Sequence, residues 1–250
     1  MSKGFDADTQ LTQATAARFV AAGYVAAGRY LKNLTMTEVA ACAQAGLKLW
    51  LIDEGYGDAA VFARGAQGGQ VDGAKAKDRA DALDAPPGSV IFFAIDYDAG
   101  QGDVANIKAY YNGYAAACAP YRAGMYADGL IASQVPTPVG DYLPGASGWA
   151  GTKDYIASGK VALLQHPPAT VLGLDVDPVD ILDESVLWDP ATNVVPTPEP
   201  APAPEPTPPD EVDPMPDLKV AQAYLGVTAD GIWGPDTDDA FAQYYGGTSC

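Results

Sequence analysis

Acidic side chains recur at the ends of short apolar runs, each of which is typical of a β-strand. The acids come in four pairs: Asp6 and Asp8, Asp53 and Glu54, Asp96 and Asp98, and Asp175 and Asp177. A single Asp in such a place can simply cap the helix that follows. Because the pattern occurs at four strand ends, we expect instead that these carboxylates converge on one cleft.

Carboxylates paired in one cleft are the groups that glycoside hydrolysis requires. One protonates the leaving oxygen, and the other stabilises or attacks the oxocarbenium-like centre. Like charges crowded in a partly buried cleft raise the pKa of one carboxyl, which keeps it protonated near neutral pH. Within Asp96-Tyr97-Asp98, an extended strand would place both carboxylates on the same side.

Strand-like and helix-like patterns alternate over residues 1–190, and these elements would position the carboxylates. One helical stretch has Thr35 or Thr37 as a candidate N-cap and ends at Gly46. Strand–helix–strand repeats favour parallel strands, so we expect an α/β fold of the (β/α)8 TIM-like barrel type with some helices missing. An open doubly wound sheet is the alternative. The expected strands are Phe5, 24–30, 47–52, 90–95, 122–126, 148–150, 161–164 and 172–176.

Several aromatic side chains and one amide lie at or just beyond the expected strands, where they could bind a sugar. Aromatic rings suit stacking on the C–H faces of sugars, and core packing is the alternative role. The candidates are Tyr30, Tyr56, Tyr97, Tyr126, Trp149 and Gln165. His166 is the only histidine and no GxSxG motif is present, so we expect no metal, no cofactor and no Ser-His-Asp triad.

The chain is strongly acidic, with a formal net charge of −18 and a pI of about 4.1. Phosphates would be repelled, which argues against nucleic acid and anionic membrane surfaces as partners. No apolar run is long enough to predict membrane insertion. The N-terminus lacks the apolar segment of a secretory signal peptide, so we expect synthesis in the cytoplasm and delivery to the cell wall by a holin, lysis, a virion or an injection device.

The end of the chain differs in composition from the rest. Residues 191–216 are expected to form a Pro-rich, extended linker, because ten of the 21 prolines fall within 196–216. Residues 217–250 are expected to form a small helical module. Its Asp-Gly-x-x-Gly-x-x-Thr turn, Asp230 to Thr237, resembles that of peptidoglycan-binding modules, and the resemblance makes Trp233 a candidate ligand contact.

The larger domain also resembles a known family. The segments GFD, RYL, KNLTMTEVAACAQAGLKLWLIDE, VIFFAIDYD and LDVD resemble, in this order over about residues 4–185, a glycoside-hydrolase-like domain related to the family 25 lysozymes. The resemblance implies functional carboxylates at Asp6, Asp96, Asp98 and Asp175. Asp98 stands where those lysozymes have the acidic Glu. We therefore expect Glu54 or Asp98 as the acid, and Asp96 or Asp6 as the stabiliser or nucleophile.

Together, the two resemblances imply a cell-wall hydrolase that cuts peptidoglycan glycan strands, of the endolysin or virion-associated lysin type. The shorter side chain of Asp98 leaves a second hypothesis open, a wall-binding protein with a degenerate barrel. A third is a component of a virion or secretion device whose tail docks to another protein.

Overall fold

The computed structural model describes residues 1–55, 58–145 and 147–193, and in the tail 222–223, 226–230, 232, 234–237 and 239–240. The chain divides into two units, Met1–Pro198 and Glu199–Cys250. Most of the expected linker, 191–216, and much of the expected module, 217–250, lie outside the described residues, so both stay predictions.

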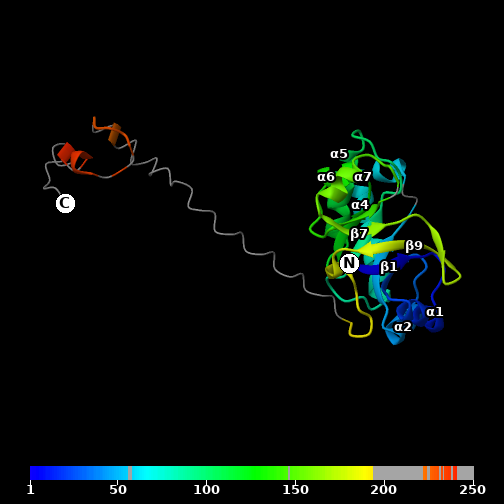
Figure 1. The fold of residues 1–250 in the computed structure, drawn as a ribbon. Coiled ribbons are helices and arrows are strands. Elements are labelled where there is room, and N and C mark those ends of the chain that lie inside the picture. The colour runs from blue at the N-terminus through cyan, green and yellow to red at the C-terminus, as the bar shows by residue number, and fades with distance from the viewer. Residues whose placement is uncertain are drawn as a thin grey trace. The chain divides into compact units, whose positions relative to one another are not determined.

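The first unit contains a closed eight-stranded β-barrel, which confirms the expected TIM-like fold (Figure 1). The strands follow one another around the barrel in sequence order, and pairing of the last strand with the first closes it. They are β1 Ser2–Asp6, β2 Tyr24–Tyr30, β3 Lys48–Asp53, β4 Val90–Ala94, β5 Arg122–Tyr126, β6 Asp141–Pro144, β7 Val161–Gln165 and β9 Leu174–Ile181.

Helices connect the barrel strands from β1 to β7. The Thr35 side chain accepts a hydrogen bond from Glu38 N, and Gly46 has a left-handed φ of 74°, so one predicted cap pair is confirmed. Helices α1 and α2 lie side by side, as do α4 and α5 (Figure 1). The helices are α1 Gln13–Ala21, α2 Met36–Ala45, α3 Ala59–Phe62, α4 Gly65–Ala82, α5 Val104–Ala117, α6 Gly129–Gln134 and α7 Thr152–Ala157, and a 3-10 turn, η1, spans Glu184–Val186.

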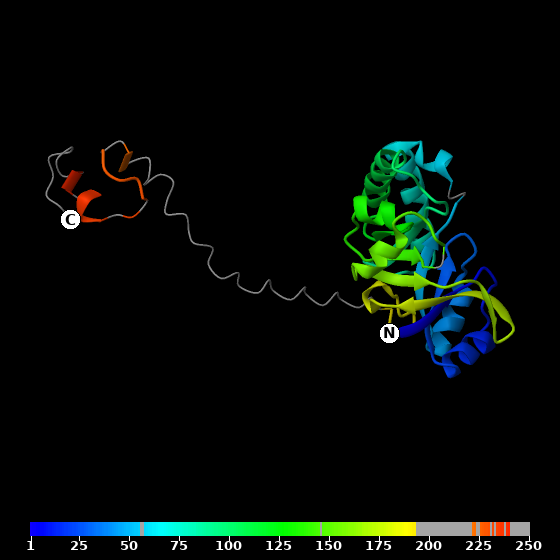
Figure 2. The same ribbon diagram turned by 45° about the horizontal axis from the view of Figure 1, so that its top comes forward.

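The barrel closes differently from the prediction of parallel strands throughout. Between β7 and β9 the chain forms β8, Ala169–Val171, which pairs with β9 as a hairpin, so β9 runs antiparallel to both β7 and β1. The connection is too short for the crossover that a parallel strand needs. This hairpin is the yellow-green loop that extends from β9 in Figure 2.

One predicted strand is wrong. Residues 148–150 lie in a loop and a turn, and the sixth strand is β6, Asp141–Pro144. That strand is only four residues long and ends in a proline, so its sequence carries little of the apolar signal of a strand.

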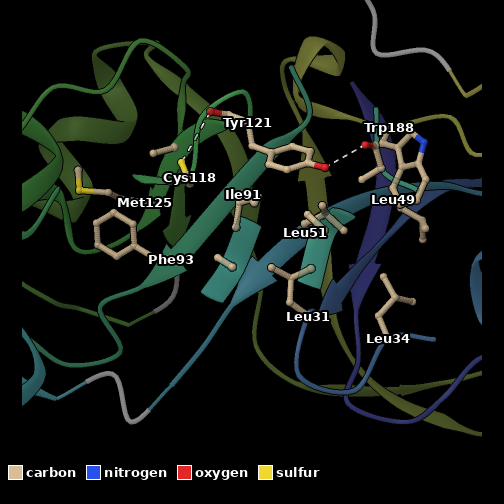
Figure 3. Close-up of a cluster of buried hydrophobic side chains, with 14 of the residues drawn as sticks. Leu31, Leu34, Leu49, Leu51, Ile91, Phe93, Cys118, Tyr121, Met125 and Trp188 are labelled. Atoms are coloured by element: carbon tan, nitrogen blue, oxygen red, sulfur yellow. Dashed lines mark hydrogen bonds between the residues drawn. The ribbon is translucent and has the colours of Figure 1, made fainter. Parts of the chain in front are cut away.

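Three buried clusters of apolar side chains are found in the described part of this unit, two of them large and the third a small group around Leu143 and Tyr155. Inside the barrel, Trp50 packs edge-on against Tyr142, and a Cβ at Gly28 would lie 2.5 Å from the Trp50 ring, so glycine is needed there. The larger cluster fills the space between strands and helices, and part of it is shown in Figure 3. Leu49, Leu51 and Ile91 of this outer cluster belong to β3 and β4.

A side chain at Gly113 is expected to destabilise the packing of α4 against α5. A Cβ there would lie 2.1 Å from Ala66 O, so the helices would have to move apart. We expect Gly113→Ala to lower the free energy of unfolding by about 1–3 kcal/mol in urea denaturation. Gly102→Ala is the control, because its Cβ would meet no atom within 4 Å. Equal stability of the two variants would contradict the packing argument.

Gln222 organises the described part of the tail. Its side chain is buried, and Nε2 lies 2.9 Å from Asp230 Oδ1, 2.8 Å from Ile232 O and 3.1 Å from Thr237 Oγ1. The first and last residues of the Asp-Gly-x-x-Gly-x-x-Thr motif are thus held by one amide. Among the helices of the described residues, none has the length and hydropathy to span a bilayer.

Candidate functional site

A small pocket of about 200 Å³ lies at the mouth of the barrel, at the end where β1 to β7 terminate. All eight barrel strands contribute to this mouth pocket or to its floor, most of them at or just beyond their carboxyl ends and β6 and β9 from within the strand. The lining residues are Tyr30, Ile52, Glu54, Ala94, Asp96, Tyr126, Tyr142, Gln165, Pro168 and Asp177, and Asp6 contacts three of them from below. The pocket is smaller than the roughly 300–1,000 Å³ of typical ligand sites, and so suits one ring-sized group.

Asp6 is the centre of a buried hydrogen-bond network. It ends β1, is 1% exposed, and accepts hydrogen bonds from the hydroxyls of Tyr142 and Tyr30, the latter at 3.2 Å. Gln165 Nε2 donates to Asp6 Oδ2 at 3.1 Å, and Tyr126 OH donates to Gln165 Oε1 at 2.9 Å. The network fixes the orientation of four polar side chains toward the mouth.

Asp6 and Asp177 form a pair of carboxyl groups with raised pKa values. Their backbones face each other across the β1–β9 pairing, so the two carboxyl groups lie close enough for each to affect the pKa of the other. Burial raises the pKa of Asp6 to about 7, the negative charge of Asp177 adds to this, and the hydrogen bonds from Tyr142, Gln165 and Tyr30 oppose it. Burial also raises the pKa of Asp177. Near neutral pH the pair therefore holds a proton.

Two further carboxylates stand on the other side of the mouth. The strand order places β4 across the barrel from β9, so Asp96 faces Asp177, whose pKa the charge of Asp96 raises further. Glu54, just beyond β3, accepts a 3.1 Å bond from Lys32 Nζ. Burial raises the pKa of the Tyr126 phenol, and the negative charges of all four carboxylates of the mouth raise it further. Four of the expected strand ends thus contribute a carboxylate to one cleft.

The structure separates three predicted site residues from this cleft. Asp98 is exposed and accepts a 2.8 Å hydrogen bond from Ala150 N, because the strand ends at Ala94 and the chain has turned by residue 98. Asp175 is exposed in the β8–β9 hairpin, where it accepts a hydrogen bond from Thr170 Oγ1. The β9 strand runs from this hairpin into the barrel, so that Asp177, two residues later, is the acid that lines the mouth pocket. Tyr97 stacks on Phe62 of α3, in the outer cluster.

The remaining predicted residues divide into two groups. Tyr30, Tyr126 and Gln165 line the mouth pocket, and Trp149 packs edge-on against Tyr126 with ring centroids 6.5 Å apart. Their sugar-binding role stays a prediction. Tyr56 and Trp233 lie outside the described residues.

Sequence reasoning missed Tyr142, and at the last strand it selected Asp175 as the functional carboxylate although Asp177 belongs to the same pair. Tyr142 was overlooked because its strand, β6, was not recognised. Asp177 follows the same apolar run as Asp175, and the signal that selects it is Pro168 and the short turn before β9, which predict a hairpin. In the described part of the chain, no three His, Cys, Asp or Glu residues are placed to hold a metal ion.

The fold is similar to that of solved structures. The Mycobacterium tuberculosis Tat-secreted protein Rv2525c, solved in complex with HEPES, has a TM-score of 0.61 and 20% identity, and the match covers 73% of this chain and 96% of Rv2525c. Its structure with L-tartrate gives a TM-score of 0.60 at 19% identity, covering 72% and 95%. An uncharacterized B. stearothermophilus protein gives 0.51 at 21% identity, covering 75% and 100%. No curated protein sequence matches.

The comparison with Rv2525c also contradicts the expectation about localisation. That protein is described as Tat-secreted, a route that uses a signal peptide. The prediction of a protein without a signal peptide, made in the cytoplasm and delivered by a holin, lysis, a virion or an injection device, is corrected on this ground.

Comparison of the sequence with protein families identifies the family of the barrel domain. The family described as "Rv2525c-like, glycoside hydrolase-like domain" matches residues 17–169, which cover the barrel from α1 to the start of β8. The match spans more than half of the chain. The chain therefore belongs to the Rv2525c-like, glycoside hydrolase-like domain family.

Proposed function

We propose that the barrel domain binds a glycan at its mouth and hydrolyses a glycosidic bond there. The observation that carries this proposal is the proton-holding pair Asp6 and Asp177, which faces Asp96 across a pocket the size of one ring. Glycosidases need one protonated and one ionised carboxyl on opposite sides of the bond that breaks.

In the proposed reaction Asp177 is the proton donor. Its proton passes to the glycosidic oxygen as the bond from that oxygen to the anomeric carbon breaks, and Asp96 stabilises the positive charge that develops on the carbon. Water then adds to the anomeric carbon and its proton returns to the carboxylates. Asp6 supports Asp177 from below, and the phenols of Tyr30 and Tyr126 contact sugar hydroxyls.

The proposed substrate is the glycan of peptidoglycan. Support comes from the tail, whose Asp230 and Thr237 match the motif of peptidoglycan-binding modules and share Gln222 as a partner. An endolysin or virion-associated role, with virion or secretion-device proteins as partners, has no support among the relatives found.

We expect Asp177→Asn to lower the release of reducing ends from purified peptidoglycan by about 10²-fold or more, since general acid catalysis contributes about 10²–10⁴-fold. Asp175→Asn is the matched control. It changes the same residue type on the same strand, outside the mouth, and should keep the activity of the unmodified protein. An equal loss of activity in both variants, or full activity of Asp177→Asn, would show that Asp177 is not the proton donor.

One observation favours a second candidate function, binding without hydrolysis. Asp98, at the position of the lysozyme Glu, is turned toward Ala150 N and does not line the mouth pocket. A binding protein would retain glycan on a column and release no reducing ends from any wall type between pH 4 and 9. Turnover by the unmodified protein excludes this candidate.

A further inference from the structure

A second cavity adjoins the mouth pocket on the outer side of the barrel wall. Its volume is about 530 Å³, within the range of ligand sites, and it shares Ala94 with the mouth pocket. Asp53 lines the second cavity and the next residue, Glu54, lines the mouth, so the end of β3 separates the two. We call this cavity the α4 pocket; its polar lining includes Asp53, Arg64, Asp72, Lys75, Arg79 and Tyr110.

The α4 pocket is lined by three cationic side chains, although the chain has few Lys and Arg residues. Arg64, Lys75 and Arg79 are three of its 14 Lys and Arg residues. Their side chains are 44%, 63% and 45% exposed, so a ligand can reach the charged ends. Among the described residues that line the mouth pocket there is no Lys or Arg, but there are three carboxylates. The two adjoining cavities thus differ in charge: three acids balance the three cations of the α4 pocket, whereas the charged residues that line the mouth are all acidic.

The three cations contact carboxylates of the protein but keep donors for a ligand. Arg79 Nη1 lies 3.3 Å from Asp53, Lys75 Nζ lies 3.5 Å from Asp72, and Arg64 also pairs with Asp72. Such exposed ion pairs contribute only about 0–1 kcal/mol each. A guanidinium has five N–H groups, and the contacts found among the described residues use one of Arg79 and two of Arg64.

The acids of the α4 pocket are engaged within the protein. Asp58 accepts a 3.2 Å bond from Val61 N and so caps α3. Asp53 accepts a 2.9 Å bond from Tyr114 OH, and Asp72 accepts one from Tyr110 OH at 2.9 Å. Phe62, Phe93 and the Tyr110 ring supply apolar surface below the charges. This combination suits an anionic group carried on a partly apolar stem.

We propose that the α4 pocket binds a carboxylate-bearing substituent of the same glycan whose ring lies at the barrel mouth. The inference rests on the proposed function. Because the mouth repels an anionic substituent and the α4 pocket attracts it, the charge difference fixes which sugar of a mixed polymer enters the mouth and in which orientation. The preferred substrate is then an acidic glycan, and a neutral glycan of equal length binds less tightly.

The test compares two probes on the full chain with Asp96→Asn, which prevents turnover. One probe is a tetrasaccharide of alternating N-acetylglucosamine and N-acetylmuramic acid, and the other is the same tetrasaccharide with its carboxylates reduced to alcohols. We expect the acidic probe to bind roughly 2–10-fold more tightly by calorimetry, the value of one or two exposed ion pairs. This advantage should shrink in 0.5 M NaCl, at which the Debye length is only about 4 Å.

Variants of residues on α3–α4 test whether the α4 pocket causes the preference for the acidic probe. Lys75→Gln, and Arg64→Gln with Lys75→Gln, should remove the preference for the acidic probe and leave the affinity for the reduced probe unchanged. Lys77→Gln is the control, since Lys77 lies on the same helix, pairs with Asp81 and does not line the α4 pocket. Lys75 is so exposed that its single variant tests the proposal even if Arg64→Gln disturbs folding.

The outcomes separate the inference from the function on which it rests. Equal affinity of the unmodified α4 pocket for both probes overturns the inference and leaves glycan binding at the mouth intact. An equal loss in Lys77→Gln and Lys75→Gln also overturns it, because the effect would then be that of net charge. Failure of both probes to bind overturns the proposed peptidoglycan substrate together with the inference.

Discussion

Replacing Asp6 with Asn is expected to abolish hydrolysis while making the folded barrel more stable at pH 8. The gain in stability comes from burial, which raises the pKa of this carboxyl to about 7 in the folded chain. In the unfolded chain an Asp has a pKa of about 3.9. Asn resembles the protonated form: its oxygen can accept the hydrogen bonds from Tyr142 and Gln165, and its amide nitrogen can donate one to the hydroxyl oxygen of Tyr30.

The gain should depend on pH in a defined direction. Below about pH 4 the Asp is protonated in both states, so the variant gains nothing. Between about pH 4 and 7 the unfolded state alone ionises, and the unmodified protein loses stability as the pH rises. Above pH 7 the loss is complete and is on the order of 4 kcal/mol for a shift of this size. Urea denaturation at pH 4.5 and pH 8 measures the difference.

Asp141 provides a control that separates stability from activity. It is 2% exposed at the start of β6, where it lines a cavity separate from the mouth pocket and contacts Tyr155, and burial raises its pKa to about 7 as well. Asp141→Asn should therefore show the same gain at pH 8 and keep hydrolysis unchanged, whereas Asp6→Asn should lose about 10²–10⁴-fold in activity. The proposal fails if both variants retain activity, or if Asp6→Asn is no more stable at pH 8 than the unmodified protein.

The sequence predicts the barrel and the acids of its parallel strands because both depend on local signals. An apolar run followed by an acid marks β1, β3 and β4, and successive parallel strands all end at the same face. The sequence alone therefore predicts that Asp6, Glu54 and Asp96 lie together at one end of the barrel. The cap pair of α2 could be predicted for the same reason, since Thr35 and Gly46 act on their own neighbours.

What the sequence does not predict depends on direction and on pairing between distant segments. Alternation along one strand cannot tell whether β9 runs parallel or antiparallel, and this direction decides that Asp177 faces Asp6 while Asp175 points to Thr170. The contact of Asp98 with Ala150 joins residues 52 positions apart. No local pattern in the sequence marks the cations of the α4 pocket, because α4 and the end of β3 meet only in the folded chain.

Removing the carboxylate of Glu38 is expected to cost the domain about 3–5 kcal/mol of stability, the typical cost of leaving a buried charge without its partner. The side chains of Glu38 and Arg29 are both 0% exposed, and Glu38 Oε1 lies 2.6 Å from Arg29 Nε. The same oxygen accepts a 2.9 Å bond from Leu11 N. Glu38→Ala would leave the Arg29 guanidinium in the core and release the loop that follows Asp6.

Two comparisons make this second prediction specific to burial. Glu184→Ala removes an exposed pair with Lys48, at 3.1 Å, and should change the free energy of unfolding by about 1 kcal/mol or less. Glu38→Gln keeps an acceptor for Leu11 N and should lose less stability than Glu38→Ala. Because the loop from Asp6 to Thr12 leads directly out of the mouth, Glu38→Ala should also lower activity at temperatures where the domain is still folded. Equal effects of Glu38→Ala and Glu184→Ala in urea denaturation would show that the buried pair does not hold this loop in place.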